Sequence, residues 1–182
     1  IDFGVGYSPE RINPGDQERK LKDITKIISA SNKSTLDQLK EIYGSIIEAG
    51  IFEAETIEVA EAAKVIENIQ RDVNIALMNE LSKIFTKLNI PIYQVLEAAN
   101  TKWNFIPFTP GLVGGHCIGV DPYYLLHKAT EVSEYPEIIS AARRINNDMT
   151  DYAVTKLLKN VVKERLNIST LSLHVYGLTF KE

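Results

Sequence analysis

The sequence predicts a mainly α-helical protein with short pieces of α/β structure at both ends. Apolar residues recur every three or four positions from Thr56 to Leu88, with no glycine or proline among them. A second stretch of this kind begins at Pro136, a residue suited to the first turn of a helix. Residues 1–7 and 173–182 are instead rich in β-prone residues. Together these observations indicate long helices between strand-like termini.

In chain order, the first element is a short strand over residues 1–7. Ser34 is then an N-cap candidate for a helix that Gly50 can close. The stretch 56–88 predicts one helix on the order of 50 Å long, at about 1.5 Å per residue. Its apolar stripe consists of Val59, Ala62, Ile66, Ile69, Val73, Leu77, Leu81, Ile84 and Leu88.

A shorter helix is expected after Pro91, and the second long helix runs from Pro136 to Val161. Residues 173–182 alternate like a strand that opens a new α/β unit. Strands without partners at both ends favour an internal fragment of a larger enzyme over two edge strands of a small sheet. Helices this long commonly pack against a partner chain, so the sequence predicts a homodimer.

Composition narrows the functional class. The chain has 182 residues, 45% of them hydrophobic, and a formal net charge of −4. This mild acidity gives no reason to expect a nucleic-acid or anionic-membrane partner. No apolar run approaches a membrane span and no signal peptide opens the chain. A single cysteine, Cys117, excludes an internal disulfide and favours a cytoplasmic setting.

The segment 104–126 breaks the helical pattern. It contains Cys117, together with four of the ten glycines and three of the seven prolines. Gly114 and Gly115 leave backbone amides that can face a phosphate or a reacting oxygen. Asp121 lies on the same side as Cys117 if the segment turns into a helix. Cys117 is then either a small buried hydrophobe or part of a site. A metal site of His116, Cys117 and Asp121 is disfavoured, because adjacent residues rarely both reach one ion.

Two further segments carry polar residues in suggestive places. Lys64 and Asn68 lie one helical turn apart and supply donors suited to an oxyanion, although most helical lysines are simply solvated. Glu10 and Arg11 follow the first strand, and strand ends are where ligands bind in α/β proteins. An ordinary surface turn is the alternative there.

These segments, in this order, resemble the UDP-glucose/GDP-mannose dehydrogenase family. The matching stretches are Tyr7–Asp16, Glu61–Glu80, Gly114–Tyr124 and the terminal Gly177–Lys181. Gly-Gly-His-Cys-Ile followed by Val-Asp-Pro-Tyr-Tyr is most similar to the branch that oxidises UDP-N-acetylhexosamines (UDP-GlcNAc, UDP-ManNAc or UDP-GalNAc). That branch makes uronic acids for bacterial surface polysaccharides.

The resemblance implies a domain organisation. Residues 1–50 would end an N-terminal NAD-binding Rossmann domain, residues 51–170 would form the central helical dimerisation and catalytic domain, and residues 171–182 would begin a C-terminal UDP-binding domain. The Gly-x-Gly-x-x-Gly fingerprint of NAD binding is missing from this sequence. The chain by itself is therefore expected to be inactive.

The resemblance also implies a reaction. C6 of the UDP-sugar is oxidised from alcohol to carboxylate with two NAD, through a cysteine thiohemiacetal and thioester. By motif match Cys117 is the nucleophile, and Lys64 and Asn68 stabilise the charged oxygen. Asp121 orients or activates water, and Glu10 assists hydrolysis of the thioester.

A further set of positions matches residues that contact the sugar nucleotide: Arg11, Phe108, Gly111, Gly114, Gly115, Phe180 and Lys181. Two other interpretations remain. One is a non-catalytic dimerisation module that kept the family fold. The other is a relative of the β-hydroxyacid dehydrogenases, which use a lysine on a long helix but need no Gly-Gly-x-Cys loop.

Overall fold

The computed structural model describes residues 3–13, 16, 18–115 and 117–177. The chain forms two compact units, the first reaching Glu67 and the second beginning at Asn68. Helix α2 (Ile57–Lys87) starts in unit 1 and continues in unit 2. The mainly helical fold that the sequence predicts is confirmed.

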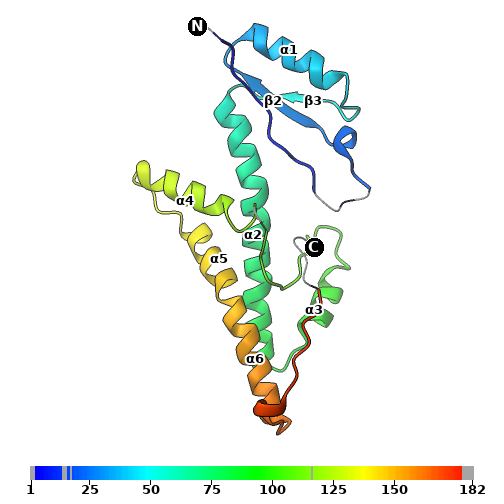
Figure 1. The fold of residues 1–182 in the computed structure, drawn as a ribbon, viewed down its shortest axis with the longest axis vertical. Coiled ribbons are helices and arrows are strands. Elements are labelled where there is room, and N and C mark those ends of the chain that lie inside the picture. The colour runs from blue at the N-terminus through cyan, green and yellow to red at the C-terminus, as the bar shows by residue number, and fades with distance from the viewer. Residues whose placement is uncertain (1–2, 14–15, 17, 116, 178–182) are drawn as a thin grey trace. The chain divides into compact units, whose positions relative to one another are not determined.

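Unit 1 is a small α/β structure (Figure 1). Its sheet has the order β1 (Gly6–Tyr7), β2 (Lys26–Ala30), β3 (Ile51–Glu53). β1 pairs antiparallel with β2, whereas β3 pairs parallel with it, in a register that sets Lys26 opposite Ile51. The parallel pair needs a crossover between β2 and β3, and helix α1 (Lys33–Gly44) provides it. The short 3-10 helix η1 (Leu21–Asp23) precedes β2. The N-terminal strand is thus an edge strand of a small sheet.

The bounds of α1 differ from the prediction. Its N-cap is Asn32, whose side-chain oxygen accepts the backbone N–H of Thr35, so Ser34 lies inside the helix. The helix ends at Gly44, because the N–H groups of Ser45, Ile46 and Ile47 bond back to the carbonyls of Glu41 and Tyr43. Gly50, with φ +94°, belongs to the turn before β3 instead.

Unit 2 is helical (Figure 1). After the rest of α2 come α3 (Ile92–Ala99), α4 (Asp121–Glu131), α5 (Glu137–Asn147) and α6 (Met149–Lys163), followed by the 3-10 helix η2 (Ile168–Thr170). Pro91 is the N-cap of α3, in line with the prediction. None of the described helices combines the length and hydropathy needed to cross a membrane.

The predicted helix from Pro136 to Val161 is in fact two helices, interrupted at Asp148. The interruption follows Asn146 and Asn147, so three residues of low helix propensity stand in a row. Short polar side chains of this kind form hydrogen bonds that compete with the helix. Here Asn146 donates to Asp72, and Asn147 donates to Tyr123. The expected strand over 173–182 is also wrong for Leu173–Gly177, which pair with no described strand; residues 178–182 lie outside the described ones.

Helix α2 has the predicted length, but a large part of its apolar stripe is exposed. In unit 2, Leu77, Ile84 and Leu88 are exposed, at 48%, 45% and 59%. Asp72 and Asn79 are fully buried instead. At about 100° per residue the two sets lie on opposite sides of the helix. Within its own unit, α2 therefore buries a row of polar side chains together with the apolar Ile69, Ala76 and Met78, and it leaves several large apolar side chains exposed.

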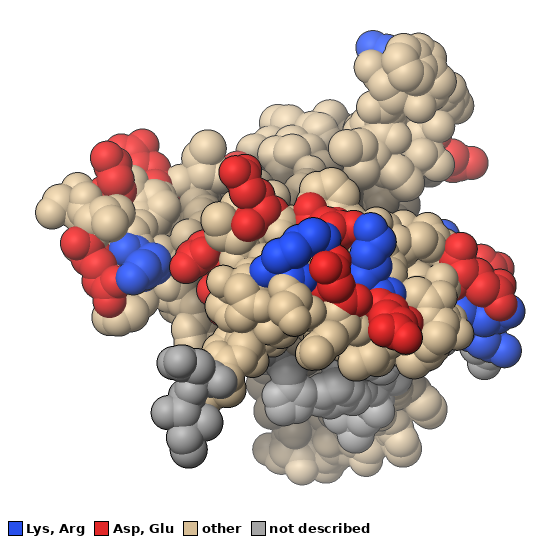
Figure 2. Space-filling model, turned by 90° about the horizontal axis from the view of Figure 1, so that it is seen from above, with Lys and Arg blue, Asp and Glu red and all other residues tan. Residues whose placement is uncertain are grey.

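The surface carries both signs of charge. Figure 2 shows acidic and basic side chains interspersed on the face that it presents, without an extended area of one sign. Unit 1 contributes the ion pairs Lys33–Asp37 and Lys40–Glu53. Exposed pairs such as these contribute little to stability, because solvent screens them.

Candidate active site

The segment around Cys117 leads directly into α4. The carbonyl oxygen of Cys117 accepts the backbone N–H groups of Val120, at 3.1 Å, and Asp121, at 2.8 Å. This turn begins the helix, with Asp121 as its first residue. Cys117 is a half-buried free thiol, and its neighbour Ile118 is buried. The spacing of four between Cys117 and Asp121 is thus a helical turn.

Asn68 meets Asp121 across unit 2. The side-chain amide of Asn68, on α2, donates to a carboxylate oxygen of Asp121 at 2.6 Å. Asn68 is only 3% exposed, so this amide is fixed in place. Two of the residues predicted for the site are therefore in direct contact although 53 positions separate them in the chain.

Glycines shape the rest of this segment. Gly115 has φ +84°, a left-handed backbone conformation that favours glycine. A Cβ on Gly114 would meet nothing within 4 Å, so this backbone is open to a ligand. Phe108 and Gly111 are half-buried. His116, Phe180 and Lys181 lie outside the described residues. Among the described residues, no group of His, Cys, Asp and Glu could hold a metal ion.

A buried polar network supports the segment from behind. Asn79 on α2 bonds both the N–H and the carbonyl of Gly111, and it donates to Asn146 on α5. Asn146 bonds Asp72, which pairs with Arg143 at 2.5 Å. Breaking a buried ion pair by removing one partner typically costs about 3–5 kcal/mol. Unit 2 is thus held together at this point by polar contacts.

Burial raises the pKa of Asp72 above its usual range, and the Arg143 charge and the Asn146 hydrogen bond oppose this without cancelling it. Sequence reasoning identified only Asn68 on this face of α2. It missed Asp72 and Asn79, together with Arg143 and Asn146 on α5. The available signal was the spacing of Asn68, Asp72 and Asn79 by four and seven, which places these three polar residues on one side of the helix.

The other predicted residues belong to unit 1. A carboxylate oxygen of Glu10 accepts the backbone N–H groups of Arg11 and Ile12, both at 2.7 Å, and another lies 3.8 Å from the Lys26 ammonium. Burial raises the pKa of Glu10, but the Ile12 hydrogen bond, the Lys26 charge, the Arg11 hydrogen bond and the Lys64 charge lower it below its usual range. Glu10 is therefore a carboxylate at neutral pH.

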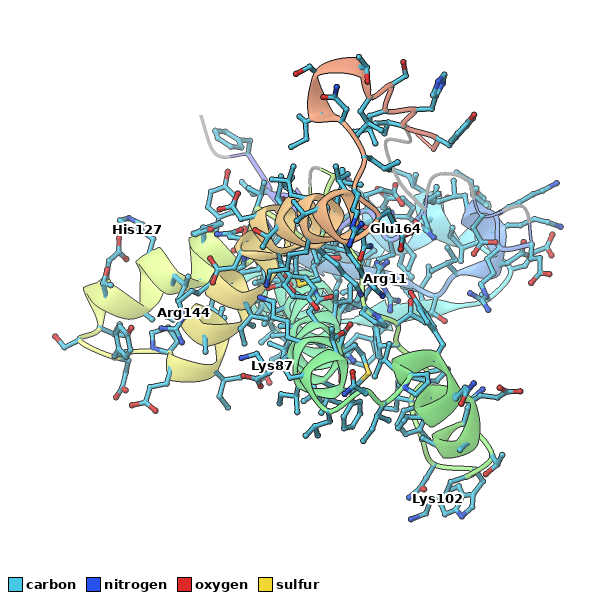
Figure 3. All side chains as sticks on the ribbon, turned by 90° about the horizontal axis from the view of Figure 1, so that it is seen from below. Arg11, Lys87, Lys102, His127, Arg144 and Glu164 are labelled. Carbon is cyan, nitrogen blue, oxygen red and sulfur yellow. The ribbon has the colours of Figure 1, made fainter. Side chains whose placement is uncertain are left out.

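Lys64 is half-buried in the first part of α2, one helical turn before Asn68. The guanidinium of Arg11 pairs with Glu67 at 2.8 Å and donates to the carbonyl of Thr25, so it is engaged within unit 1. Two titratable side chains of unit 2 are directed away from α2. Figure 3 shows Lys102 beyond the end of α3 and His127 on the outer side of α4.

The described part of unit 1 does not fit the pyrophosphate of NAD. A dinucleotide cradle needs glycines whose backbone is open to the phosphates. A Cβ on Gly4 would lie 1.8 Å from the Thr35 hydroxyl oxygen, and one on Gly6 would lie 2.5 Å from a Leu39 methyl carbon. These glycines therefore serve close packing against α1.

Comparison with known proteins identifies the family that this chain matches. Residues 58–148 match the sequence model of the UDP-glucose/GDP-mannose dehydrogenase family, central domain. Protein CapL of Staphylococcus aureus is 56% identical over 181 residues, which are 100% of this chain and 43% of CapL. The UDP-N-acetyl-D-glucosamine 6-dehydrogenase of Salmonella typhi is 57% identical over the same share of both chains. This chain thus spans less than half the length of these relatives.

A solved structure shares the fold. The UDP-D-ManNAc dehydrogenase from Pyrococcus horikoshii superposes with a TM-score of 0.82 at 34% identity, covering 91% of this chain and 39% of that one. The family match includes most of α2, the Cys117 segment, α4 and α5. The chain therefore belongs to the UDP-glucose/GDP-mannose dehydrogenase family and contains its central domain.

Proposed function

We propose that the full-length protein oxidises C6 of a UDP-N-acetylhexosamine to the uronic acid, with NAD as hydride acceptor, for surface polysaccharide biosynthesis. The observation that carries this proposal is the 57% identity, over the whole chain, to a UDP-N-acetyl-D-glucosamine 6-dehydrogenase. The contact between Asn68 and Asp121, beside the turn of Cys117, supports it with a plausible reaction site.

In the proposed reaction the Cys117 thiolate adds to the carbon of a C6 aldehyde. The new S–C bond forms as the carbonyl oxygen takes the negative charge. An amide carries two N–H donors, and we assign the one that Asn68 does not give to Asp121 to this oxygen. The thiohemiacetal is then oxidised to the thioester, with NAD as the hydride acceptor. Water adds to the thioester carbonyl, the S–C bond breaks, and the carboxylate product separates from the regenerated Cys117 thiol.

Three more residues receive roles. Lys64 stabilises the charged oxygen. Asp121 orients the attacking water. Glu10 assists hydrolysis of the thioester as a carboxylate, the form that its lowered pKa favours. The open backbone at Gly114 suits contact with the substrate; the same role is proposed for Gly115, Arg11, Phe108, Gly111, Phe180 and Lys181.

The domain assignment remains part of the proposal. Residues 1–50 would belong to the NAD-binding domain, 51–170 to the central domain and 171–182 to the UDP-binding domain. NAD would be held by parts of the full-length protein outside this chain. We place the full-length protein in the cytoplasm, because a catalytic thiol stays reduced there.

The proposal is tested by incubating the full-length protein with NAD and a panel of UDP-sugars and following NADH. We expect two NADH per UDP-N-acetylhexosamine, with a kcat/KM at least about tenfold above that for UDP-glucose, because buried polar groups built for an N-acetyl substituent are left unpaired without it. Absence of NADH with every sugar would contradict the proposal and favour the non-catalytic module.

We also propose a homodimer through the exposed apolar face of α2. Ile84→Glu should raise the dimer dissociation constant at least about 30-fold, because an unpaired charge in an apolar interface costs about 2 kcal/mol or more. Sedimentation of the full-length protein measures this. Thr86→Glu, an equally exposed change on the opposite side of α2, is the control and should leave the constant unchanged. A monomeric parent protein at micromolar concentration would refute this interface.

A further inference from the structure

Helix α2 holds the Cys117 segment at two points. At one end Asn68 bonds Asp121, at the start of α4. At the other end Asn79 bonds Gly111. The two asparagines are eleven residues apart, which is about three helical turns or about 16 Å, so they lie on the same side of α2. Cys117 lies in the chain between the two attachment points.

The attachment at Gly111 fixes orientation as well as distance. The side-chain oxygen of Asn79 accepts the N–H of Gly111 at 2.8 Å, and its amide nitrogen donates to the carbonyl of the same residue at 2.9 Å. A carboxamide offers a donor and an acceptor side by side, which this pairing requires. An apolar or hydroxyl side chain in place of Asn79 cannot reproduce both bonds.

Asn79 is itself held in place. It is fully buried, and its amide nitrogen also donates to the side-chain oxygen of Asn146 at 2.9 Å. Asn146 in turn donates to the carboxylate of Asp72 at 2.7 Å and to the Asp72 carbonyl at 3.0 Å. A site is held more precisely when its side chains stand on helices and are fixed by further hydrogen bonds than when they stand on loops.

We propose that Asn79, backed by Asn146, is a positioning residue of the dehydrogenase reaction: it fixes Gly111 and thereby the place at which the segment presents the Cys117 thiol. This inference rests on the proposed function of Cys117. Among the hydrogen bonds of the described residues 104–115 and 117–120, those at Gly111 are the ones made with a side chain of another element. Releasing them leaves the bond at Asp121 as the side-chain hydrogen bond that still joins this described stretch to α2.

The test uses the full-length protein with Asn79→Ala and Asn79→Asp. The aspartate variant keeps the volume of the side chain but cannot donate, so it separates lost hydrogen bonds from an empty cavity. Asn74→Ala is the matched control, because Asn74 is another α2 asparagine whose amide donates only to the Gln70 carbonyl of the same helix. Each variant is assayed for kcat and KM per folded molecule.

We expect both Asn79 variants to lower kcat by about 10²-fold, the size of effect that a misplacement of about 1 Å produces. KM for NAD should stay within about twofold, because cofactor binding is not affected. The rate of iodoacetamide alkylation at Cys117, resolved by peptide mass spectrometry, should change at least about fivefold because the setting of the thiol changes. Asn74→Ala should leave all three unchanged.

Folded Asn79 variants with parental kcat and parental alkylation would overturn the proposal. So would losses that follow only the folded fraction, or equal changes in Asn74→Ala. If Asn79→Ala does not fold, the aspartate variant alone decides the question. If the parent protein forms no NADH with any UDP-sugar, the proposed function fails, whereas the alkylation rates still show whether Asn79 positions Cys117.

Discussion

Cys117→Ser in the full-length protein is expected to lower uronic acid formation by at least about 10³-fold, because the proposed covalent step would lose its nucleophile. A serine hydroxyl without an activating base is a much weaker nucleophile than a cysteine thiol. Binding of the UDP-sugar should stay within about threefold, since the exchange of sulfur for oxygen leaves the backbone of the segment in place. Product formation and binding calorimetry measure the two effects.

Ile118→Val is the control for this change. Ile118 is the buried neighbour of Cys117, and its shortening tests whether any small disturbance of the segment lowers the rate. It should cost about 0.5–1.5 kcal/mol of stability and leave turnover close to that of the parent. Near-normal turnover of Cys117→Ser would exclude Cys117 as the nucleophile.

Lys64→Ala is expected to lower kcat by about 10²–10³-fold, which is typical for the loss of one donor to an oxyanion. A second effect has a defined sign. Because the charge of Lys64 contributes to the lowered pKa of Glu10, its removal lets that pKa rise. Glu10 is proposed to act as a carboxylate, so the acidic limb of the pH–rate profile should move to higher pH.

Lys87→Ala serves for comparison, since Lys87 is an exposed lysine at the other end of the same helix (Figure 3). It should change neither kcat nor the pH profile. If Lys64→Ala lowers kcat no more than Lys87→Ala does, Lys64 is a solvated lysine and the oxyanion needs another donor.

Local signals explain what could be predicted of the fold. The bounds of α2 follow from periodicity and from the absence of glycine and proline, and Pro91 marks the start of α3. The face that α2 buries does not follow from such signals, because it depends on partners on α5 that are remote in sequence. The break at Asp148 was missed because the apolar spacing continues across it from Ile145 to Met149.

In the candidate site, too, local contacts could be predicted from the sequence and long-range contacts could not. The turn from Cys117 to Asp121 is local, and its spacing is visible in the sequence. The contact between Asn68 and Asp121 spans 53 positions, and that between Asn79 and Gly111 spans 32. A motif indicates which residue types matter, but only the packed helices determine which of them meet.

The buried polar residues of α2 have a consequence for how this helix changes in evolution. Each inward asparagine or aspartate meets partners of fixed geometry, so even a substitution of equal size leaves a donor or acceptor unmatched. The outward leucines and isoleucines need only shape and hydrophobicity, which several aliphatic residues supply. In an alignment of relatives we therefore expect the buried polar positions Asn68, Asp72 and Asn79 to vary least, and the exposed apolar positions Leu77, Ile84 and Leu88 to interchange with other aliphatic residues.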